Sequence, residues 1–421
     1  MKSASDWLST DKSSVKSWQL GLFVIAMLVY GNTLFNSYNF DDELVTTDQN
    51  ELVQQGIDAL PEIFTTHYFT WNNYKADYRP LVKASFALEY QLFGFNPFVS
   101  HLINIMLFGF IVVLILKFLK RIFPDVKIAI LSAVVLLFVV HPVNTEVVAS
   151  LKNRDELFSL LFVLLSFLSA LNFVEGNNKA IGTMILFFLL SLFSKMSSVT
   201  WLPVLAAVLI FKNMPRQKSV ATVGTIFGII VVFYAAVFGL LDEWGRDFVF
   251  IEVPYFRIES VSDKWASIIA AAGYYLKLLV YPYPLCCYYG FNQIPVTNWS
   301  DWSVYVSVLL YSTLIILALV GLKKRSLVGF GAIIILCDLV LFVNVLYPYT
   351  GVIGERVLFG STLGAALMLI GILDVKRKIN RESSTQLIRH SKSFITAVLL
   401  VAVVGGWLTI NRNAEWKDRL T

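Results

Sequence analysis

Acidic and basic side chains recur where the apolar segments of this sequence end. The set comprises two adjacent carboxylates, four cations and three further polar residues: Asp41, Asp42, Arg79, Arg154, Lys195, Arg356, Glu146, Asp155 and His141. A carboxylate can act as a general base, and Arg or Lys can bind a phosphate. Ionisable groups beside apolar segments are costly, so each calls for a reason. We therefore predict group transfer from a phosphate-bearing lipid to a nucleophile.

Asp41 and Asp42 are the candidates for catalysis, because they directly follow the first apolar segment and open a long loop. We predict Asp41 as the general base, although Asp42 suits that role equally or orients Asp41. The competing interpretation is a solvated loop start, or a cap for a helix that follows Glu43. Two carboxylates can also ligate a divalent metal, but no ligand spacing supports a metal site, and the sequence indicates no particular cofactor.

The four cations are the candidates for holding a phosphate: Arg79, Arg154, Lys195 and Arg356. Arg offers a planar fork to phosphate and Lys a point charge. Each cation also has a structural interpretation, either as an anchor for a helix or as a side chain that reaches the membrane interface. For Arg154 the structural interpretation is an ion pair with its neighbour Asp155 at the start of a helix.

Three residues complete the predicted substrate site: Glu146, Asp155 and His141. A histidine at a boundary is more often a hydrogen-bonded structural residue than a ligand. Asp338 stands inside an apolar segment, where it either pairs within the helix bundle or stays protonated. Its partner is not evident from the sequence, and a structural role suits it at least as well as a functional one.

The segments that carry these residues are unusually apolar. The chain has 421 residues, of which 57% are hydrophobic and 15% charged, whereas a soluble globular chain is about 45–50% apolar and about 25% charged. This composition excludes a soluble enzyme and a disordered chain. Three cysteines exclude a disulfide framework. No basic stripe interleaves with aromatic residues, so we predict no nucleic-acid partner.

A membrane-spanning helix needs about 20 mostly apolar residues. Eleven segments meet this description: 17–35, 97–118, 128–145, 155–175, 180–195, 197–213, 219–240, 303–322, 327–346, 357–374 and 393–410. The first has no small-residue cleavage site and is typical of an uncleaved signal-anchor. The sequence therefore predicts an all-α integral membrane protein with about 11 transmembrane helices.

The distribution of Lys and Arg predicts the orientation, because basic residues favour the cytoplasmic side. If residues 264–282 lie along the membrane as an amphipathic or re-entrant helix, all major basic clusters, including the one at 376–392, share the side of the N-terminus. The predicted layout is a cytoplasmic tail, a transmembrane domain with two long outer loops, and a short outer tail: 1–16, 17–410 with 36–96 and 241–302, and 411–421.

Both outer loops are too long to be simple connections. In the first loop, residues 57–64 and 81–90 repeat their apolar side chains at a spacing of three to four. This spacing predicts amphipathic helices that lie on the membrane surface. The transmembrane helices would thus be accompanied by amphipathic helices in the first and in the later outer loop.

Six short motifs occur in order along the chain: Phe-Asp-Asp at 40–42, Tyr-Arg-Pro-Leu at 78–81, Phe-Asn-Pro-Phe-Val-Ser-His-Leu-Ile-Asn at 95–104, His-Pro-Val-Asn-Thr-Glu-Val-Val-Ala at 141–149 with Arg154-Asp155 after it, Phe-Ser-Lys at 193–195, and Gly-Glu-Arg-Val-Leu-Phe at 354–359. Their order resembles the membrane half of the transmembrane-and-TPR O-mannosyltransferases, which belong to the GT-C glycosyltransferases. The resemblance covers most of residues 20–420.

The resemblance implies a GT-C type helical bundle, a polyprenyl-phosphate mannose donor and transfer with inversion to Ser or Thr of a secreted or membrane protein. It places the reaction on the periplasmic or luminal side of a bacterial inner membrane or the endoplasmic reticulum. It also implies a catalytic aspartate at Asp41 or Asp42, and a second acid for which Glu146 and Asp155 qualify. Two departures stand out. The 421 residues contain no tetratricopeptide repeats, either because the protein is a short relative or because the sequence stops before them, and Met196 stands where the family tends to have Glu.

Two other classes of protein remain alternatives. A transporter or flippase for lipid-linked substrates also buries charges, but secondary transporters usually show paired repeats and broken helices, and the sequence shows neither. A non-catalytic membrane scaffold is the second alternative. A donor lipid would stabilise an enzyme that binds it, but not such a scaffold.

Overall fold

The computed structural model describes residues 12–46, 50–71, 74–241, 252–346, 348–379 and 384–418. Several sequence predictions fall partly outside these residues. They are the start of the tail 1–16, residues 242–251 of the later outer loop, the end of the outer tail 411–421, and the side chains of the basic cluster at 376–392. The regular secondary structure of the described residues is helical except for one short two-stranded ribbon, and the chain divides into two compact units.

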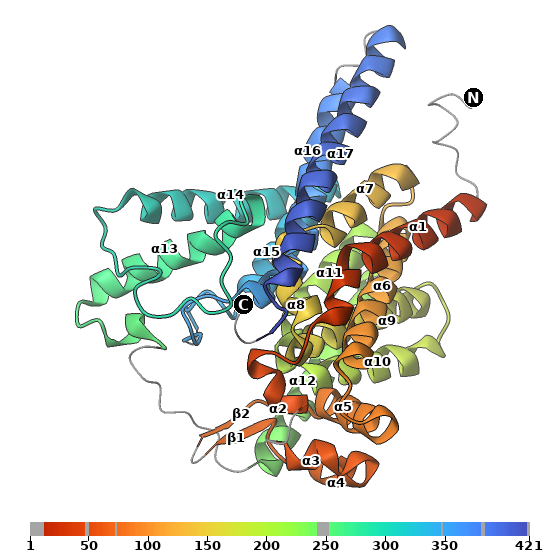
Figure 1. The fold of residues 1–421 in the computed structure, drawn as a ribbon. Coiled ribbons are helices and arrows are strands. Elements are labelled where there is room, and N and C mark those ends of the chain that lie inside the picture. The colour runs from red at the N-terminus through yellow and green to blue at the C-terminus, as the bar shows by residue number, and fades with distance from the viewer. Residues whose placement is uncertain are drawn as a thin grey trace. The chain divides into compact units, whose positions relative to one another are not determined.

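The first unit comprises residues up to 135, residues 147–247 and residues from 406 onward. Its helices are α1 (Lys12–Tyr30), α2 (Glu43–Thr46), α3 (Glu51–Gln54), α4 (Leu60–Ile63), α5 (Pro80–Phe93), α6 (Pro97–Ile122), most of α7 (Ile128–Val139), part of α8 (Thr145–Ala149), α9 (Arg154–Val174), α10 (Ala180–Ser194), α11 (Leu202–Phe211) and α12 (Arg216–Leu240). Short 3₁₀ helices lie at Gly31–Phe35, Phe40–Asp42, Gly56–Ala59, Leu151–Asn153 and Met196–Trp201. Long apolar helices pack side by side in this unit, with α9 against both α6 and α10 (Figure 1).

The loop between α1 and α6, for which we keep the name first outer loop after its predicted side of the membrane, folds onto the start of α9. The antiparallel ribbon pairs β1 (Phe69–Trp71) with β2 (Tyr74–Ala76), and α5 begins at Pro80, a residue suited to the first turn of a helix. Apolar side chains of the loop and of residue 151 form one buried cluster: Val45, Val53, Tyr68, Val82, Phe86 and Leu151. This cluster fixes the loop that carries the predicted carboxylates.

A polar clamp joins the two ends of the first unit. The Asn413 side chain donates to the backbone oxygen of Val29 at 2.9 Å and to Asn32 Oδ1 at 2.8 Å. The Asn36 side chain donates to the backbone oxygen of Asn413 at 3.1 Å, and the Ser37 amide donates to the backbone oxygen of Lys417 at 2.8 Å. The end of the last helix is therefore fixed beside the start of the first outer loop.

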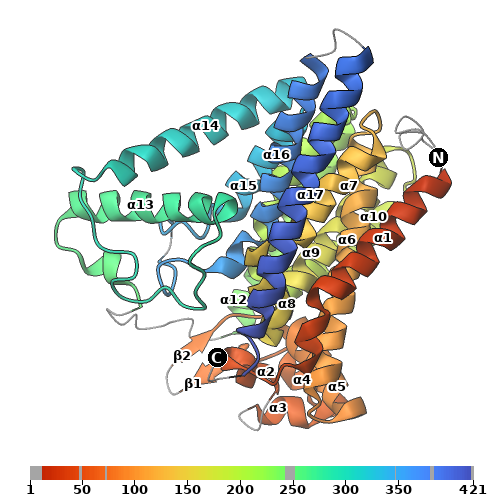
Figure 2. The ribbon, with the colours of Figure 1, turned by 45° about the horizontal axis from the view of Figure 1, so that its top comes forward.

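The second unit comprises residues 136–146 and 248–405. Its helices are α13 (Val261–Val280), α14 (Trp302–Lys324), α15 (Leu327–Leu339), α16 (Phe359–Ile379) and most of α17 (Ser384–Ala414), with 3₁₀ helices at Pro142–Asn144, Pro254–Arg257 and Glu355–Leu358. Figure 2 shows α13 beside α14 and α15 beside α16. The backbones of α15 and α16 approach so closely at Gly331 and Gly364 that a side chain at either would meet the other's carbonyl oxygen. Small residues permit such contacts in membrane helices.

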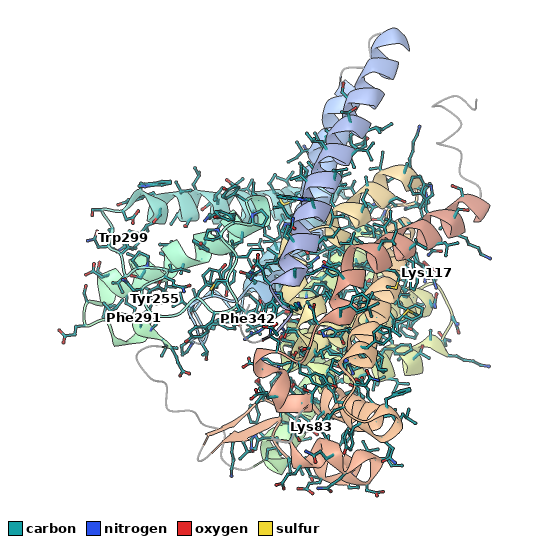
Figure 3. All side chains as sticks on the ribbon, in the orientation of Figure 1. Lys83, Lys117, Tyr255, Phe291, Trp299 and Phe342 are labelled. Carbon is teal, nitrogen blue, oxygen red and sulfur yellow. The ribbon has the colours of Figure 1, made fainter. Side chains whose placement is uncertain are left out.

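Aromatic side chains organise the segment around α13, where Figure 3 labels Tyr255, Phe291 and Trp299. The Tyr255 hydroxyl donates to the backbone oxygen of Ile294 at 2.9 Å, and Trp299 Nε1 donates to that of Ser262 at 3.2 Å. The residues before α13 are therefore linked to those after it, and the latter are also linked to the start of α13.

Seven described helices are long and apolar enough to cross a membrane: Ser14–Phe35, Pro97–Ile122, Leu151–Val174, Arg216–Leu240, Trp302–Lys324, Glu355–Asp374 and Ser393–Ala414. An eighth arises if Ile128–Val139 and Pro142–Ala149, bent by 54° at the break between them, form one span. Shorter apolar helices occupy the other predicted segments, at Ala180–Ser194, Met196–Phe211 and Leu327–Leu339. The helices fit a multi-pass membrane protein, and the count of about 11 spans stays a prediction.

The first outer loop differs in detail from its predicted form. The helix expected at 57–64 is divided into two short turns, Gly56–Ala59 and Leu60–Ile63, whereas the one expected at 81–90 is the continuous helix α5. The ribbon β1–β2 was not predicted. α13, which covers most of the segment 264–282, is not among the seven candidate spans.

Candidate active site

Asp42 is a buried anchor between the first outer loop and the residues that directly precede α9. Its Oδ1 accepts hydrogen bonds from the Lys152 amide at 2.8 Å and the Ser150 hydroxyl at 3.4 Å, and its Oδ2 accepts one from the Asn39 amide at 3.0 Å. The side chain is fully buried. Burial raises the pKa of Asp42 to about 6, and the hydrogen bonds from Lys152 and Asn39 limit the rise. Asp42 therefore holds the loop in place.

This raised pKa predicts a pH-dependent stability. Folded Asp42 binds its proton more tightly than the unfolded chain does, so its contribution to stability is full below about pH 4 and is lost as pH rises through about 6. The difference between 3.8 and about 6 corresponds to about 3 kcal/mol. We expect the gap in unfolding temperature between the wild type and Asp42→Asn to be largest near pH 4 and to shrink toward pH 7. A gap that stays constant over this range would contradict the prediction.

Asp41 differs from its neighbour because its side chain reaches solvent. The carboxylate is 58% exposed and forms an ion pair with Lys152 Nζ, whose side chain is mostly buried. Lys152 thus contacts both acids, Asp42 through its backbone amide and Asp41 through its ammonium group. The accessible carboxylate of the adjacent pair is Asp41.

A second group of charges surrounds Asp155 near the start of α9. Arg79 Nη1 lies 2.7 Å from Asp155 Oδ2, and Lys195 Nζ lies 3.7 Å from the same oxygen. Lys195 also pairs with Glu156, and Arg79 with the exposed Asp77. Lys195 lies between α10 and the next 3₁₀ helix, and its backbone is extended there, with φ −156° and ψ 118°. A break in the helix therefore places this lysine among the acids of α9.

Arg154 lies in the interior of the first unit, where its guanidinium group already has hydrogen-bond partners. Its guanidinium is fully buried and donates to Asn104 Oδ1 at 2.7 Å, Glu89 Oε2 at 2.9 Å and the Ser100 carbonyl at 3.2 Å. The same group lies 3.8 Å from the centroid of the Phe86 ring. The structure thus places Arg154 as a link between α5, α6 and α9, with few directions left for a ligand.

The remaining predicted residues lie in the second unit. Glu146, which is buried, accepts from the Arg356 amide at 2.7 Å and from its Nη1 at 3.1 Å. Arg356 keeps 28% of its side chain exposed. The His141 ring accepts from the Val143 amide at 3.4 Å and lies 3.2 Å from the backbone oxygen of Leu279, as a structural residue would.

Asp338 also lies in the second unit, and the structure identifies its partner. Its Oδ2 accepts hydrogen bonds from the Ser361 amide at 2.7 Å and from the Ser361 hydroxyl at 2.8 Å. Because Asp338 belongs to α15 and Ser361 to α16, these bonds join the two helices. The contact supports the structural interpretation of this residue.

Sequence reasoning missed three residues of the first unit: Lys152, Glu156 and Glu89. The first two stand in the charged run 152–156, next to residues that were selected, so proximity in the sequence was a usable signal. Glu89 carries a different signal, because it falls on the apolar face of α5, seven residues after the buried Val82. An acid on the buried face of an amphipathic helix calls for a partner, and here that partner is Arg154.

No group of three or more His, Cys, Asp or Glu side chains that could hold a metal ion occurs in the described parts of the chain. The carboxylates of the first unit instead have cationic or backbone partners. Asp41 faces Lys152, and Asp155 faces Arg79 and Lys195. The arrangement is suited to proton transfer and to binding an anion that competes with these acids.

Carboxylates and cations near the ends of apolar helices are suited to group-transfer chemistry, and the chain is similar to proteins that are named transferases. A protein O-mannosyl-transferase of Caenorhabditis elegans is 25% identical over 95% of this chain and 56% of its own length. Protein O-mannosyl-transferase TMTC4 of Homo sapiens is 25% identical over 94% of the chain and 59% of its own length. Protein O-mannosyl-transferase TMTC2 of Mus musculus is 26% identical over 72% of the chain and 39% of its own length.

These relatives confirm the resemblance that the six motifs indicated. The chain is similar over most of its length to TMTC-type protein O-mannosyl-transferases, and it spans between 39% and 59% of the length of the three relatives described. No model of a protein family matches the chain.

Proposed function

We propose that this protein is a membrane glycosyltransferase that moves mannose from a polyprenyl-phosphate donor to a hydroxyl group of a protein. The observation that carries the proposal is the similarity to protein O-mannosyl-transferases over most of the chain, together with an exposed carboxylate, Asp41, in the first outer loop. The names of the relatives supply mannose and protein as the sugar and the acceptor class. The polyprenyl phosphate comes from the resemblance to the GT-C enzymes.

In the proposed reaction, Asp41 accepts the proton of a Ser or Thr hydroxyl. The hydroxyl oxygen then attacks the anomeric carbon of mannose, and the bond from that carbon to the phosphate oxygen breaks. A single displacement inverts the anomeric carbon. The lipid leaves as a phosphate monoester that carries one more negative charge than the donor. Because Asp41 is 58% exposed, an acceptor can reach it from solvent.

Arg79 and Lys195 are the proposed partners of the departing phosphate in the first unit. Both retain part of their side-chain surface and share the carboxylate of Asp155, so an incoming anion competes with an acid for each cation. In the second unit, Arg356 is the candidate on the same chemical grounds. We leave Arg154 out of this role, because its guanidinium is fully buried and already bonded on its three nitrogens.

We further propose that Asp41 faces the non-cytoplasmic side and that the N-terminus is cytoplasmic. The support is the distribution of basic clusters, which share the side of the N-terminus if α13 does not cross the membrane. The first outer loop then meets translocated proteins, which fits a secreted or membrane protein as acceptor. In this arrangement the lipid-linked sugar enters between apolar helices.

The test uses the purified protein in lipid vesicles with polyprenyl-phosphate mannose and a Ser/Thr-containing peptide. We expect mannose to appear on the peptide with inverted anomeric configuration. Polyprenyl-phosphate glucose and a nucleotide-linked mannose serve as alternative donors, and a peptide with Ala in place of every Ser and Thr serves as control. Movement of the lipid-linked sugar across the bilayer without transfer would instead favour a flippase. Neither transfer nor stabilisation by the donor would favour a scaffold.

A further inference from the structure

Tyr68 carries a buried hydroxyl group in the first outer loop. The residue is 4% exposed, and its hydroxyl has no hydrogen-bond partner among the described residues. The chain fixes its position, because the Tyr68 amide donates to the backbone oxygen of Asp77 at 2.9 Å and closes the end of the ribbon. The ring packs in the same buried cluster as Val45 and Leu151.

Charged side chains also lie near this ring. The guanidinium carbon of Arg79 lies 5.0 Å from the ring centroid, and Lys83 Nζ, labelled in Figure 3, lies 5.9 Å from it. Arg79 in turn pairs with Asp155 and with Asp77. The phenol therefore lies beside the group of charges that includes the proposed phosphate ligands.

The hydroxyl is a hydrogen-bond donor in this setting. Burial raises the pKa of Tyr68 above its ordinary value, and the acids Asp155, Asp77 and Asp41 raise it further, while Arg79 lowers it. The phenol thus keeps its proton at neutral pH. A buried donor without an acceptor destabilises the folded protein, and phenylalanine would fill the same space without that penalty. A ligand that supplies an acceptor would remove the penalty.

Asp77 marks the place where such a ligand can enter. Its side chain is 54% exposed and pairs with Arg79, whose side chain is 16% exposed, so solvent reaches this pair from the side of Asp77. A phosphate is the same kind of partner for a guanidinium as a carboxylate. A phosphate that displaces Asp77 from Arg79 therefore exchanges one anion for another.

We propose that the Tyr68 hydroxyl donates a hydrogen bond to the phosphate of the lipid-linked substrate when that phosphate replaces Asp77 against Arg79. The inference deepens the proposed function, from which it takes the identity of the ligand. Tyr68 becomes a substrate-binding residue that sequence motifs did not reveal, since it lies ten residues before the Tyr-Arg-Pro-Leu motif.

The experiment measures how much polyprenyl monophosphate is needed to raise the unfolding temperature of the detergent-solubilised protein, for the wild type and for Tyr68→Phe. Without lipid, Tyr68→Phe should be as stable as the wild type or more stable. With lipid, it should need about 10–100-fold more polyprenyl phosphate for the same rise, because a hydrogen bond to a charged oxygen is lost. Polyprenol without the phosphate should stabilise neither protein.

Tyr78→Phe is the matched control. Tyr78 is a buried tyrosine of the same loop, but its hydroxyl donates to the backbone oxygen of Phe64 at 2.8 Å. This variant should be less stable than the wild type without lipid and should respond to polyprenyl phosphate at the wild-type concentration. Each substitution removes one tyrosine hydroxyl group, so their opposite effects separate ligand binding from folding.

The inference is overturned if Tyr68→Phe responds to polyprenyl phosphate as the wild type does, if polyprenol acts as well as its phosphate, or if the wild type shows no response. Sugar transfer, measured on the same preparations, judges the proposed function separately. A wild type that is stabilised by the phosphate lipid in a Tyr68-dependent way, yet transfers no mannose, would support this contact and reject the transferase.

Discussion

Asp41→Asn is expected to lower sugar transfer by about 10²–10⁴-fold, the range by which a general base accelerates a reaction. Asparagine has nearly the same shape but cannot accept the proton of the acceptor hydroxyl. The protein should remain folded, because the Asp41 side chain is exposed and the oxygen of asparagine can still accept a hydrogen bond from the mostly buried Lys152. The measurement is the initial rate of mannose transfer in vesicles, together with the unfolding temperature of the same preparation.

Asp42→Asn is the matched control, because it makes the same chemical change at the neighbouring residue. Asp42 accepts hydrogen bonds from the backbone amides of Lys152 and Asn39 through its two oxygens. Asparagine has only one oxygen, so one of these amides would face the NH₂ group of its side chain. Its main effect should be a loss of stability of about 1–3 kcal/mol near pH 4, which shrinks toward pH 7 as Asp42 of the wild type ionises. If Asp41→Asn transfers mannose at the wild-type rate, while Asp42→Asn is folded and inactive, the assignment of the base must pass to Asp42.

Arg154→Met is expected to destabilise the protein by about 3–5 kcal/mol, because it leaves the carboxylate of Glu89 buried without its cation. The loss should appear as a lower unfolding temperature and a lower yield of folded protein. It should appear both with and without the donor lipid, since Arg154 acts between helices rather than on a ligand.

A double variant, Arg154→Met with Glu89→Gln, tests this reason. Removing both charges of a buried pair is far less costly than removing one, so the double variant should recover much of the lost stability. An Arg154→Met protein that folds as stably as the wild type, but no longer responds to the donor lipid, would return Arg154 to the set of phosphate ligands.

The long apolar helices were predictable from the sequence because about 20 consecutive apolar residues specify little else. α6 and α14 follow the predicted segments closely. The ribbon β1–β2 was not predictable, because its strands have only three residues each and depend on packing against the loop. The number of membrane crossings is equally hard to infer where Pro142 or Lys195 interrupts an apolar run.

The candidate site was predictable by residue type but not by role. Asp41 and Asp42 are chemically identical in the sequence, and only the turn at residues 40–42 buries one and exposes the other. The partner of Arg154 stands 65 residues earlier, in an element of its own. Tyr68 lies in none of the six motifs. Long-range packing decides such roles, and a single sequence does not record it.

The polar clamp between Asn413 and the start of the first outer loop has a practical consequence for handling the protein. The bond from Ser37 to Lys417 holds the far end of the described chain four residues from the proposed base. A purification tag or fluorescent fusion attached there would lie near the proposed base and, if the proposal holds, would hinder the approach of an acceptor polypeptide. Labels inserted at the other end of α9, such as in the turn at Gly176 between α9 and α10, would avoid the surroundings of Asp41.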